Sequence, residues 1–290
     1  VALPVWRQGD FSALATPVRD PFAGNAPFAG NRIPASRLNP VAVKIQDRFF
    51  PLPNTGPDNV LTAQNYRDVL FVEKNPNPTT VVKLDHRFND RAFAYWRLTS
   101  TDWVQRPYEG DLPTIGRRDG SRTSRSMALA YTHTIRATLL SEARWGFASD
   151  DIPARGPING PALVAELGLR NLAPNLPDVG GLFNVSFTQL GLTGISGGST
   201  CGPCGYNKKQ HFQENLTWFR GLHTVKGGFY MGYGRYQDLR QAAGLFGNHT
   251  YSNRFTNFTY ADFLLGMPVS GTVTSMPRTH YRWTELNPYI

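Results

Sequence analysis

Three stretches of the chain share one design: a run of alternating apolar and polar residues, a very short polar turn, and a second alternating run. They are Thr79–Asp102, Arg125–Asp150 and Gln210–Gln237, and a long stretch rich in turn-forming residues follows each. Alternation with a period of two predicts β-strands, because successive side chains on a strand point to opposite faces. The chain is therefore expected to contain three antiparallel hairpins separated by long connections.

The expected strands have one apolar face and one polar face. Six apolar side chains are expected to face lipid: Val82, Leu84, Trp96, Leu98, Trp145 and Phe147. Six charged side chains are expected to face a watery lumen: Lys83, Asp85, Arg87, Arg97, Glu142 and Arg144. This division is what the wall of a water-filled membrane barrel requires.

A soluble β-sandwich also alternates, and three features of the sequence favour a membrane barrel instead. Trp and Tyr residues lie near the strand ends, as in the aromatic girdles of membrane barrels. The face opposite the apolar one is charged, and short and long connections alternate strictly. We therefore predict an all-β fold, a partial antiparallel transmembrane β-barrel whose long extracellular loops carry short helices.

The number of strands is too small for a complete barrel. One further strand is expected over Arg278–Ile290, in addition to the three hairpins. In hydrocarbon every backbone N–H and C=O must be paired, so an open sheet edge is excluded. The strands are therefore expected to belong to a larger barrel, and the chain to be a piece cut from a longer protein.

The composition argues against a helical membrane protein and against a nucleic-acid-binding protein. No stretch approaches the roughly 20 apolar residues of a membrane helix, whereas a barrel strand needs only about 9–11 residues. The net charge is +9, but the Arg residues are scattered and no nucleic-acid recognition module is visible. We expect no nucleic-acid partner.

One connection carries a clear helix signal. Within Ser36–Phe50, four apolar residues recur at helical spacing: Leu38, Val41, Ile45 and Phe49. Ser36 or Asn39 can cap this helix, and Pro51 ends it. Shorter helical segments are expected at Pro161–Leu169 and Tyr260–Gly266, and the rest of Asp150–Lys209 and Leu239–Pro277 is expected to be loop.

The only two cysteines, Cys201 and Cys204, form a Cys-Gly-Pro-Cys motif. The same letters occur in thioredoxin-type redox sites, where a helix N-terminus lowers the thiol pKa. Here the flanking residues carry no helix signal, and a structural zinc site would need four ligands. The preferred interpretation is a small disulfide within a loop.

No residue pattern predicts an enzyme. The six histidines lack metal-binding spacing, and no nucleophile, base and orienting acid can be grouped from the sequence. The pair Asp150-Asp151 fits either a calcium ligand at a loop mouth or, as we prefer, a solvated turn. We predict no catalytic, cofactor or metal site.

Several short motifs spread over the chain resemble the barrel region of TonB-dependent outer-membrane receptors of the Oar-like group. They are Arg7–Ser12, Asp20–Gly24, Pro27–Arg37, Pro51–Asn54, Leu84–Asp90, Asn215–Trp218, His223–Gly228 and Ala261–Gly266. Each motif is weak alone, and together they are fairly specific. Since the motifs of this family's barrel are structural, no binding residue is carried over.

The resemblance implies a bacterial outer-membrane receptor that takes up a bulky solute, with energy supplied through TonB. It implies a full protein with a signal peptide, a carboxypeptidase-regulatory-like domain, a plug and a barrel of about 22 strands. Residues 1–290 would be part of one barrel domain, with 1–78 a long N-terminal surface loop and 79–290 hairpins and loops. The implied partners are outer-membrane lipid, an unidentified ligand, and the TonB complex through N-terminal regions absent from this chain.

The alternative from another class is a secreted soluble β-rich module that binds glycans through exposed Tyr and Trp. The two hypotheses differ in the surroundings of the apolar face. A soluble module must bury this face against a second sheet or a layer of helices, whereas a barrel presents it to lipid.

Overall fold

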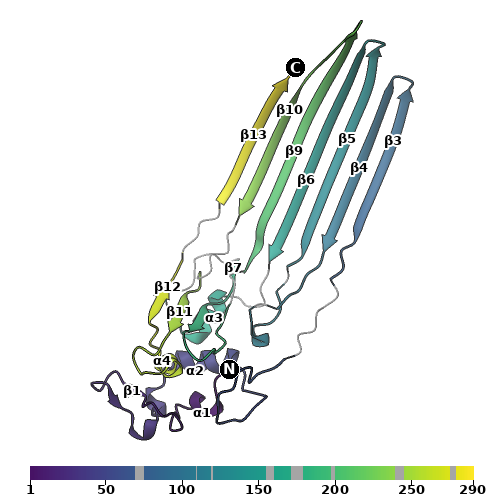
Figure 1. Ribbon diagram of the computed structural model, residues 1–290. Helices are drawn as coiled ribbons and strands as arrows, with labels where there is room; N and C mark the ends of the chain where they lie inside the picture. The colour runs from purple at the N-terminus through teal and green to yellow at the C-terminus, as the bar shows by residue number, and fades with distance from the viewer. Residues whose placement is uncertain are drawn as a thin grey trace.

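The fold consists of one long antiparallel sheet and a compact unit at one end of it (Figure 1). The computed structural model describes residues 1–68, 75–108, 110–118, 120–154, 160–170, 179–196, 200–238, 245–274 and 279–290. The compact unit is formed by residues 1–68, 110–118, 160–170, 182–196 and 245–274. No described helix is long and apolar enough to cross a membrane.

The sheet contains the three predicted hairpins and the predicted additional strand. Its strand order is β13-β10-β9-β6-β5-β4-β3, all pairs are antiparallel, and the short β7 (Val179–Gly180) joins β9. The long strands are β3 (Thr79–Asn89), β4 (Ala92–Trp103), β5 (Arg122–Arg136), β6 (Leu139–Ala154), β9 (Thr200–Arg220), β10 (His223–Asp238) and β13 (Thr279–Tyr289).

Short and long connections lie at opposite ends of the sheet. Within the hairpins only residues 90–91, 137–138 and 221–222 separate the strands, and these turns lie at the end away from the compact unit (Figure 1). The connections at the other end are long and lead into the compact unit. This is the asymmetry that the sequence predicts.

Strand β9 begins earlier than predicted, at Thr200 instead of Gln210. Its first part pairs with the ends of β6 and β10, for example Tyr206 with Asp151 and with Gln237. Hydrogen bonds to two neighbouring strands therefore outweigh the local preference of a Gly-rich segment for loop. The prediction of a loop around Cys201 and Cys204 is thus wrong, because their backbone belongs to β9. The predicted disulfide is not tested, because both side chains lie outside the described part of the structure.

The sheet has no covering layer. Across the described chain, neither face of its long strands packs against a helix or a second sheet, and the helices pack with one another and with the short strands of the compact unit. Large apolar side chains on the strands stay exposed, including Leu84, Leu129 and Leu286. Strands β3 and β13 are the edges of this open, partial barrel wall. The arrangement is not that of a soluble sandwich.

The hydrophobic core lies in the compact unit and not in the sheet. Among the buried apolar residues, Ala92 and Ala130 are the two that come from the long strands. The unit is built from α1 (Pro4–Arg7), β1 (Arg19–Asp20), β2 (Ala26–Pro27), η1 (Ala29–Asn31), η2 (Ala35–Arg37), α2 (Pro40–Phe49), η3 (Pro113–Ile115), α3 (Gly160–Leu167), β8 (Asn184–Phe187), β11 (Asn248–Tyr251), α4 (Thr259–Leu264) and β12 (Ser270–Thr272).

An aromatic cluster joins these distant segments. The Phe263 ring lies 5.2 Å from Tyr251, 5.6 Å from Phe187 and 5.8 Å from Phe50, between ring centroids. Edge-to-face aromatic pairs of this kind stabilise a core beyond the area they bury. The described parts of the long connections therefore pack with residues 1–68 as one body.

Candidate functional site

Strand register sorts the strand residues into two faces, because directly paired residues in neighbouring strands lie on the same face. One row across the sheet runs Lys83, Arg97, Ala128, Gly146, His211, Gly232 and Glu285. The next row runs Asp85, Tyr95, Ala130, Arg144, Gln213, Tyr230 and Asn287. A third contains Arg87, Phe93, Thr132, Glu142, Asn215, Gly228 and Tyr289. The register thus brings the six charged candidates together on one face, here called the polar face.

The opposite face, here called the apolar face, gathers the six apolar candidates. One row runs Leu84, Trp96, Leu129, Trp145, Phe212, Met231 and Leu286. Beside it run Val82, Leu98, Met127 and Phe147. The first of these rows crosses every long strand of the sheet. In the described chain nothing covers the apolar face.

Most charges of the polar face are paired along or between strands. The Lys83 Nζ lies 2.8 Å from an Asp85 carboxylate oxygen, and an Arg144 nitrogen lies 3.5 Å from Glu142 Oε1. Nearby, the Lys209 Nζ lies 3.7 Å from Glu285 Oε2. These groups are partly exposed, so each pair contributes little to stability and mainly sets the local charge pattern.

A hollow of about 490 Å³ lies near the middle of the polar face. Small residues of β5 and β6 form its floor: Ser126, Ala128, Gly146 and Ala148. Longer side chains of β4, β6, β9 and β10 surround it: Tyr95, Arg97, Arg144, Lys209, His211 and Tyr230. We refer to this hollow as the polar groove.

Gly146 sets the position of the His211 ring in the polar groove. A Cβ atom on Gly146 would lie 2.3 Å from His211 Cε1, so the imidazole lies directly over the glycine. The same ring stacks on Tyr230, with centroids 5.7 Å apart and planes inclined by 23°. Sequence reasoning missed His211, Lys209 and Tyr230, although alternation within the third hairpin combined with the strand register would have placed them on this face.

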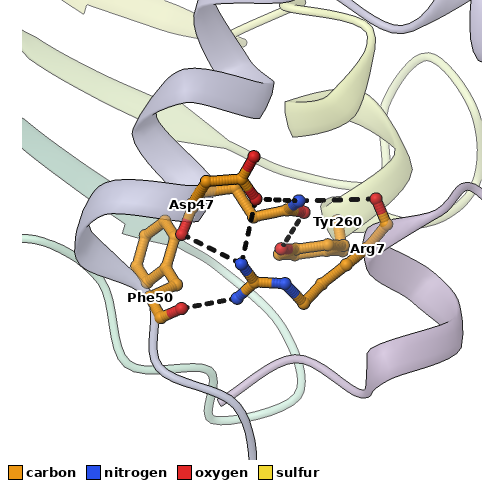
Figure 2. Close-up of polar contacts among 5 residues, drawn as sticks. Arg7, Asp47, Phe50 and Tyr260 are labelled. Carbon is orange, nitrogen blue, oxygen red and sulfur yellow. Dashed lines mark hydrogen bonds and ion pairs between the residues drawn. The ribbon is translucent and has the colours of Figure 1, made fainter.

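A second polar centre lies in the compact unit and serves the fold (Figure 2). Arg7 donates hydrogen bonds to the backbone oxygens of Phe50 and Gln46 and to Asp47 Oδ1, the last at 3.1 Å. The Tyr260 hydroxyl donates to Gln46 Oε1 at 2.7 Å. Burial raises the pKa of Tyr260, so this hydroxyl stays protonated. The network supplies donors to the carbonyl of Gln46, in the last turn of α2, and to that of the C-cap residue Phe50.

The residues that the structure describes bring together no group of three metal-binding side chains. Asp150 and Asp151 lie within β6, so the solvated turn preferred for them is wrong. As neighbours on a strand they point to opposite faces. Asp150 instead accepts a hydrogen bond from Ser124 at 2.5 Å and pairs with Arg122 at 3.0 Å.

Comparison with known proteins identifies the class of the chain. It matches the family described as outer membrane beta barrel domain over residues 1–290. A similar solved structure is that of the outer membrane transporter YddB from Escherichia coli, with a TM-score of 0.38 and 11% sequence identity. The match covers 72% of this chain and 24% of that one, so the chain spans about a quarter of the transporter's length. No curated protein matches the sequence.

Proposed function

Because the chain belongs to the family of outer-membrane β-barrel domains and resides in the bacterial outer membrane, we propose that it forms part of the wall of a TonB-dependent transporter. The observation that carries the proposal is the two-faced sheet, whose polar and apolar faces both lack a covering layer among the residues that the structure describes. A wall with water on one side and lipid on the other has this composition. A secreted glycan-binding module does not fit an outer-membrane location.

The polar face would line the lumen and the apolar face would contact lipid. In this assignment Lys83, Arg97 and Arg144 are exposed to a water-filled interior, where their charges remain solvated. Leu84, Trp96 and Trp145 lie against acyl chains. Strands beyond β3 and β13 would close the barrel, to about 22 strands in the Oar-like group, because unpaired strand edges are not tolerated in lipid.

In transport, different parts of the protein would have different roles, as in TonB-dependent receptors. The compact unit and the long connections would meet a bulky solute outside the cell, and the lumen would pass it inward. Energy would come from the TonB complex. The motifs from Arg7–Ser12 to Ala261–Gly266 support this family. No chemistry on the solute is proposed.

A charge-insertion experiment tests which face meets lipid. Leu84→Arg and Trp145→Arg, made in the full-length protein, are each expected to cost about 2–4 kcal/mol near the bilayer midplane. Val81→Arg is the matched control, because Val81 is next to Val82 and lies on the polar face. The measurement is urea unfolding in lipid vesicles, with the folded fraction read from heat-modifiable migration on a gel. Equal costs at Val81 and Leu84 would contradict the assignment of the faces.

A second experiment tests the coupling to TonB separately. Full-length protein extracted from outer membranes is expected to bind the purified C-terminal domain of TonB in a pull-down. A protein that folds as a barrel and fails to bind this domain would rule out TonB coupling and leave the barrel assignment intact.

A further inference from the structure

We propose that the polar groove is a binding subsite for an anionic solute, one that carries carboxylate or phosphate groups, with Arg97 as its anchor. The inference rests on the proposed function, because the polar face must line the lumen. It goes further by naming the chemistry of the solute and the position on the barrel wall where the solute binds.

The charge of the groove is the first argument. Three cations line it, Arg97, Arg144 and Lys209, and no acidic residue does. The nearby carboxylates of Glu142 and Glu285 already pair with Arg144 and Lys209. Among the residues that the structure describes, the Arg97 guanidinium has no ion pair, which leaves it available to a solute in this part of the wall.

The position of Arg97 is the second argument. It is paired directly across β3 and β4 with Lys83, another cation. Like charges at directly opposed positions are unfavourable, and Asp85 offsets only the lysine, at 2.8 Å. A bound anion would relieve this repulsion. The planar guanidinium can also hold a carboxylate or phosphate through two parallel hydrogen bonds.

The shape of the groove is the third argument. Its floor of Ala128, Gly146 and Ala148 leaves room between the taller side chains, and its volume of about 490 Å³ lies within the range of small-molecule sites. Tyr95 and Tyr230 add aromatic surface at either side. The groove therefore fits an organic anion better than a single inorganic ion, because aromatic walls offer contact to a carbon skeleton.

The test is calorimetric titration of the full-length protein, purified from outer membranes in detergent. The probes are citrate for carboxylates, pyrophosphate for phosphates, and sucrose as an uncharged solute. The wild type is expected to bind at least one of the two anions and not sucrose. The anion that binds tells which of the two groups the subsite prefers.

Arg97→Ala is expected to weaken the anion's binding about tenfold or more, because a charge-assisted bidentate contact is lost. Arg125→Ala is the matched control. Arg125 lies on the apolar face of the neighbouring strand β5, beside the groove residue Ser126, so the variant removes the same charge from the other face of the sheet. Its affinity is expected to equal that of the wild type.

Gly146→Ala tests the shape without changing any charge. The added methyl group would displace His211 from its place over β6, and anion affinity is expected to fall. Heat-modifiable migration verifies that each variant is folded. The proposal is overturned if neither anion binds, or if Arg97→Ala and Arg125→Ala weaken binding equally. If Leu84→Arg is costly and Val81→Arg is tolerated while no anion binds, only the subsite is refuted and the barrel proposal stands.

Discussion

At the scale of single residues, Arg7 shows how one side chain can hold distant segments together. Its side chain is 12% exposed and donates hydrogen bonds to the last carbonyls of α2 (Figure 2). Removing it leaves the Phe50 carbonyl without this donor, while the Gln46 carbonyl keeps its hydrogen bond from the Phe50 N–H. We expect Arg7→Met to destabilise the compact unit by about 2–3 kcal/mol. Hydrogen exchange of α2 in the full-length protein measures this as faster opening of the helix.

Arg32 provides the control for Arg7. Its ion pair with Asp10, at 3.0 Å, is on the surface, with 64% of the arginine side chain exposed. A solvated pair of this kind contributes at most about 1 kcal/mol. Arg32→Met should therefore leave exchange in α2 nearly unchanged. If both variants changed exchange in α2 equally, the burial of Arg7 would not explain its contribution to the stability of the helix.

The buried carboxyl of Asp262 gives the compact unit a dependence on pH. It accepts hydrogen bonds from the backbone N–H of Phe255 at 3.1 Å and of Thr256 at 2.8 Å. Burial raises the pKa of Asp262, and these hydrogen bonds oppose the shift only in part. A carboxyl with a raised pKa binds more protons in the folded state. Its contribution to stability is therefore complete below the unfolded pKa and is lost as the pH rises through the folded value.

We therefore predict a pH-dependent difference between the wild type and Asp262→Asn. As the pH rises above about 4, the ordinary pKa of aspartate, the unfolding temperature of the wild type should fall relative to that of the variant. Calorimetry of the full-length protein in detergent from acidic to neutral pH measures the difference. A change of the opposite sign would mean that the hydrogen bonds to Asp262 outweigh its burial and lower its pKa.

At the scale of elements, the start of α2 depends on Asn39. Its side-chain oxygen accepts hydrogen bonds from the backbone N–H of Val41 at 2.9 Å and of Ala42 at 3.2 Å. Its own N–H donates to the carbonyl of Leu264 at 2.7 Å, which ties α2 to α4. Asn39→Ala is expected to destabilise α2 by about 1 kcal/mol, as loss of an N-cap does. Hydrogen exchange of α2 measures it, and Asn39→Asp, which retains a capping oxygen, should restore slow exchange.

Elements with a local signal could be predicted from the sequence. The cap at Asn39 and the buried face with Ile45 and Phe49 agree with the prediction for α2, because capping and helical spacing are properties of nearby residues. The three hairpins follow equally from alternation and turn residues. The early start of β9 could not be predicted, because hydrogen bonds to β6 and β10 decide it.

The core and the groove depend on contacts between distant residues. Trp6 packs on Phe258 with ring centroids 5.0 Å apart, although about 250 residues separate them in the chain. Nothing near Trp6 in the sequence indicates this partner. Likewise, alternation predicts that Arg97 and Trp96 point to opposite faces of their strand. Only the register of four strands brings Arg97 to the same groove as His211.

At the scale of the whole molecule, the two ends of the sheet differ in architecture. The turn end is formed by loops of two residues, and the other end carries a packed unit with nearly all of the described core (Figure 1). In outer-membrane barrels the short turns face the periplasm and the long connections face the outside. The compact unit should therefore be a preformed, rigid surface outside the cell.

This orientation can be tested with single cysteines in a background of Cys201→Ser and Cys204→Ser. Phe22 lies in the compact unit and is 68% exposed, whereas Leu222 lies in a tight turn and is 102% exposed. Both sites are open to solvent, so a difference in labelling reports only the side of the membrane. A membrane-impermeant maleimide should label Phe22→Cys on intact cells, and Leu222→Cys only after the outer membrane is permeabilised. The reverse pattern would place the compact unit in the periplasm, where it could not meet a solute before the solute enters the barrel.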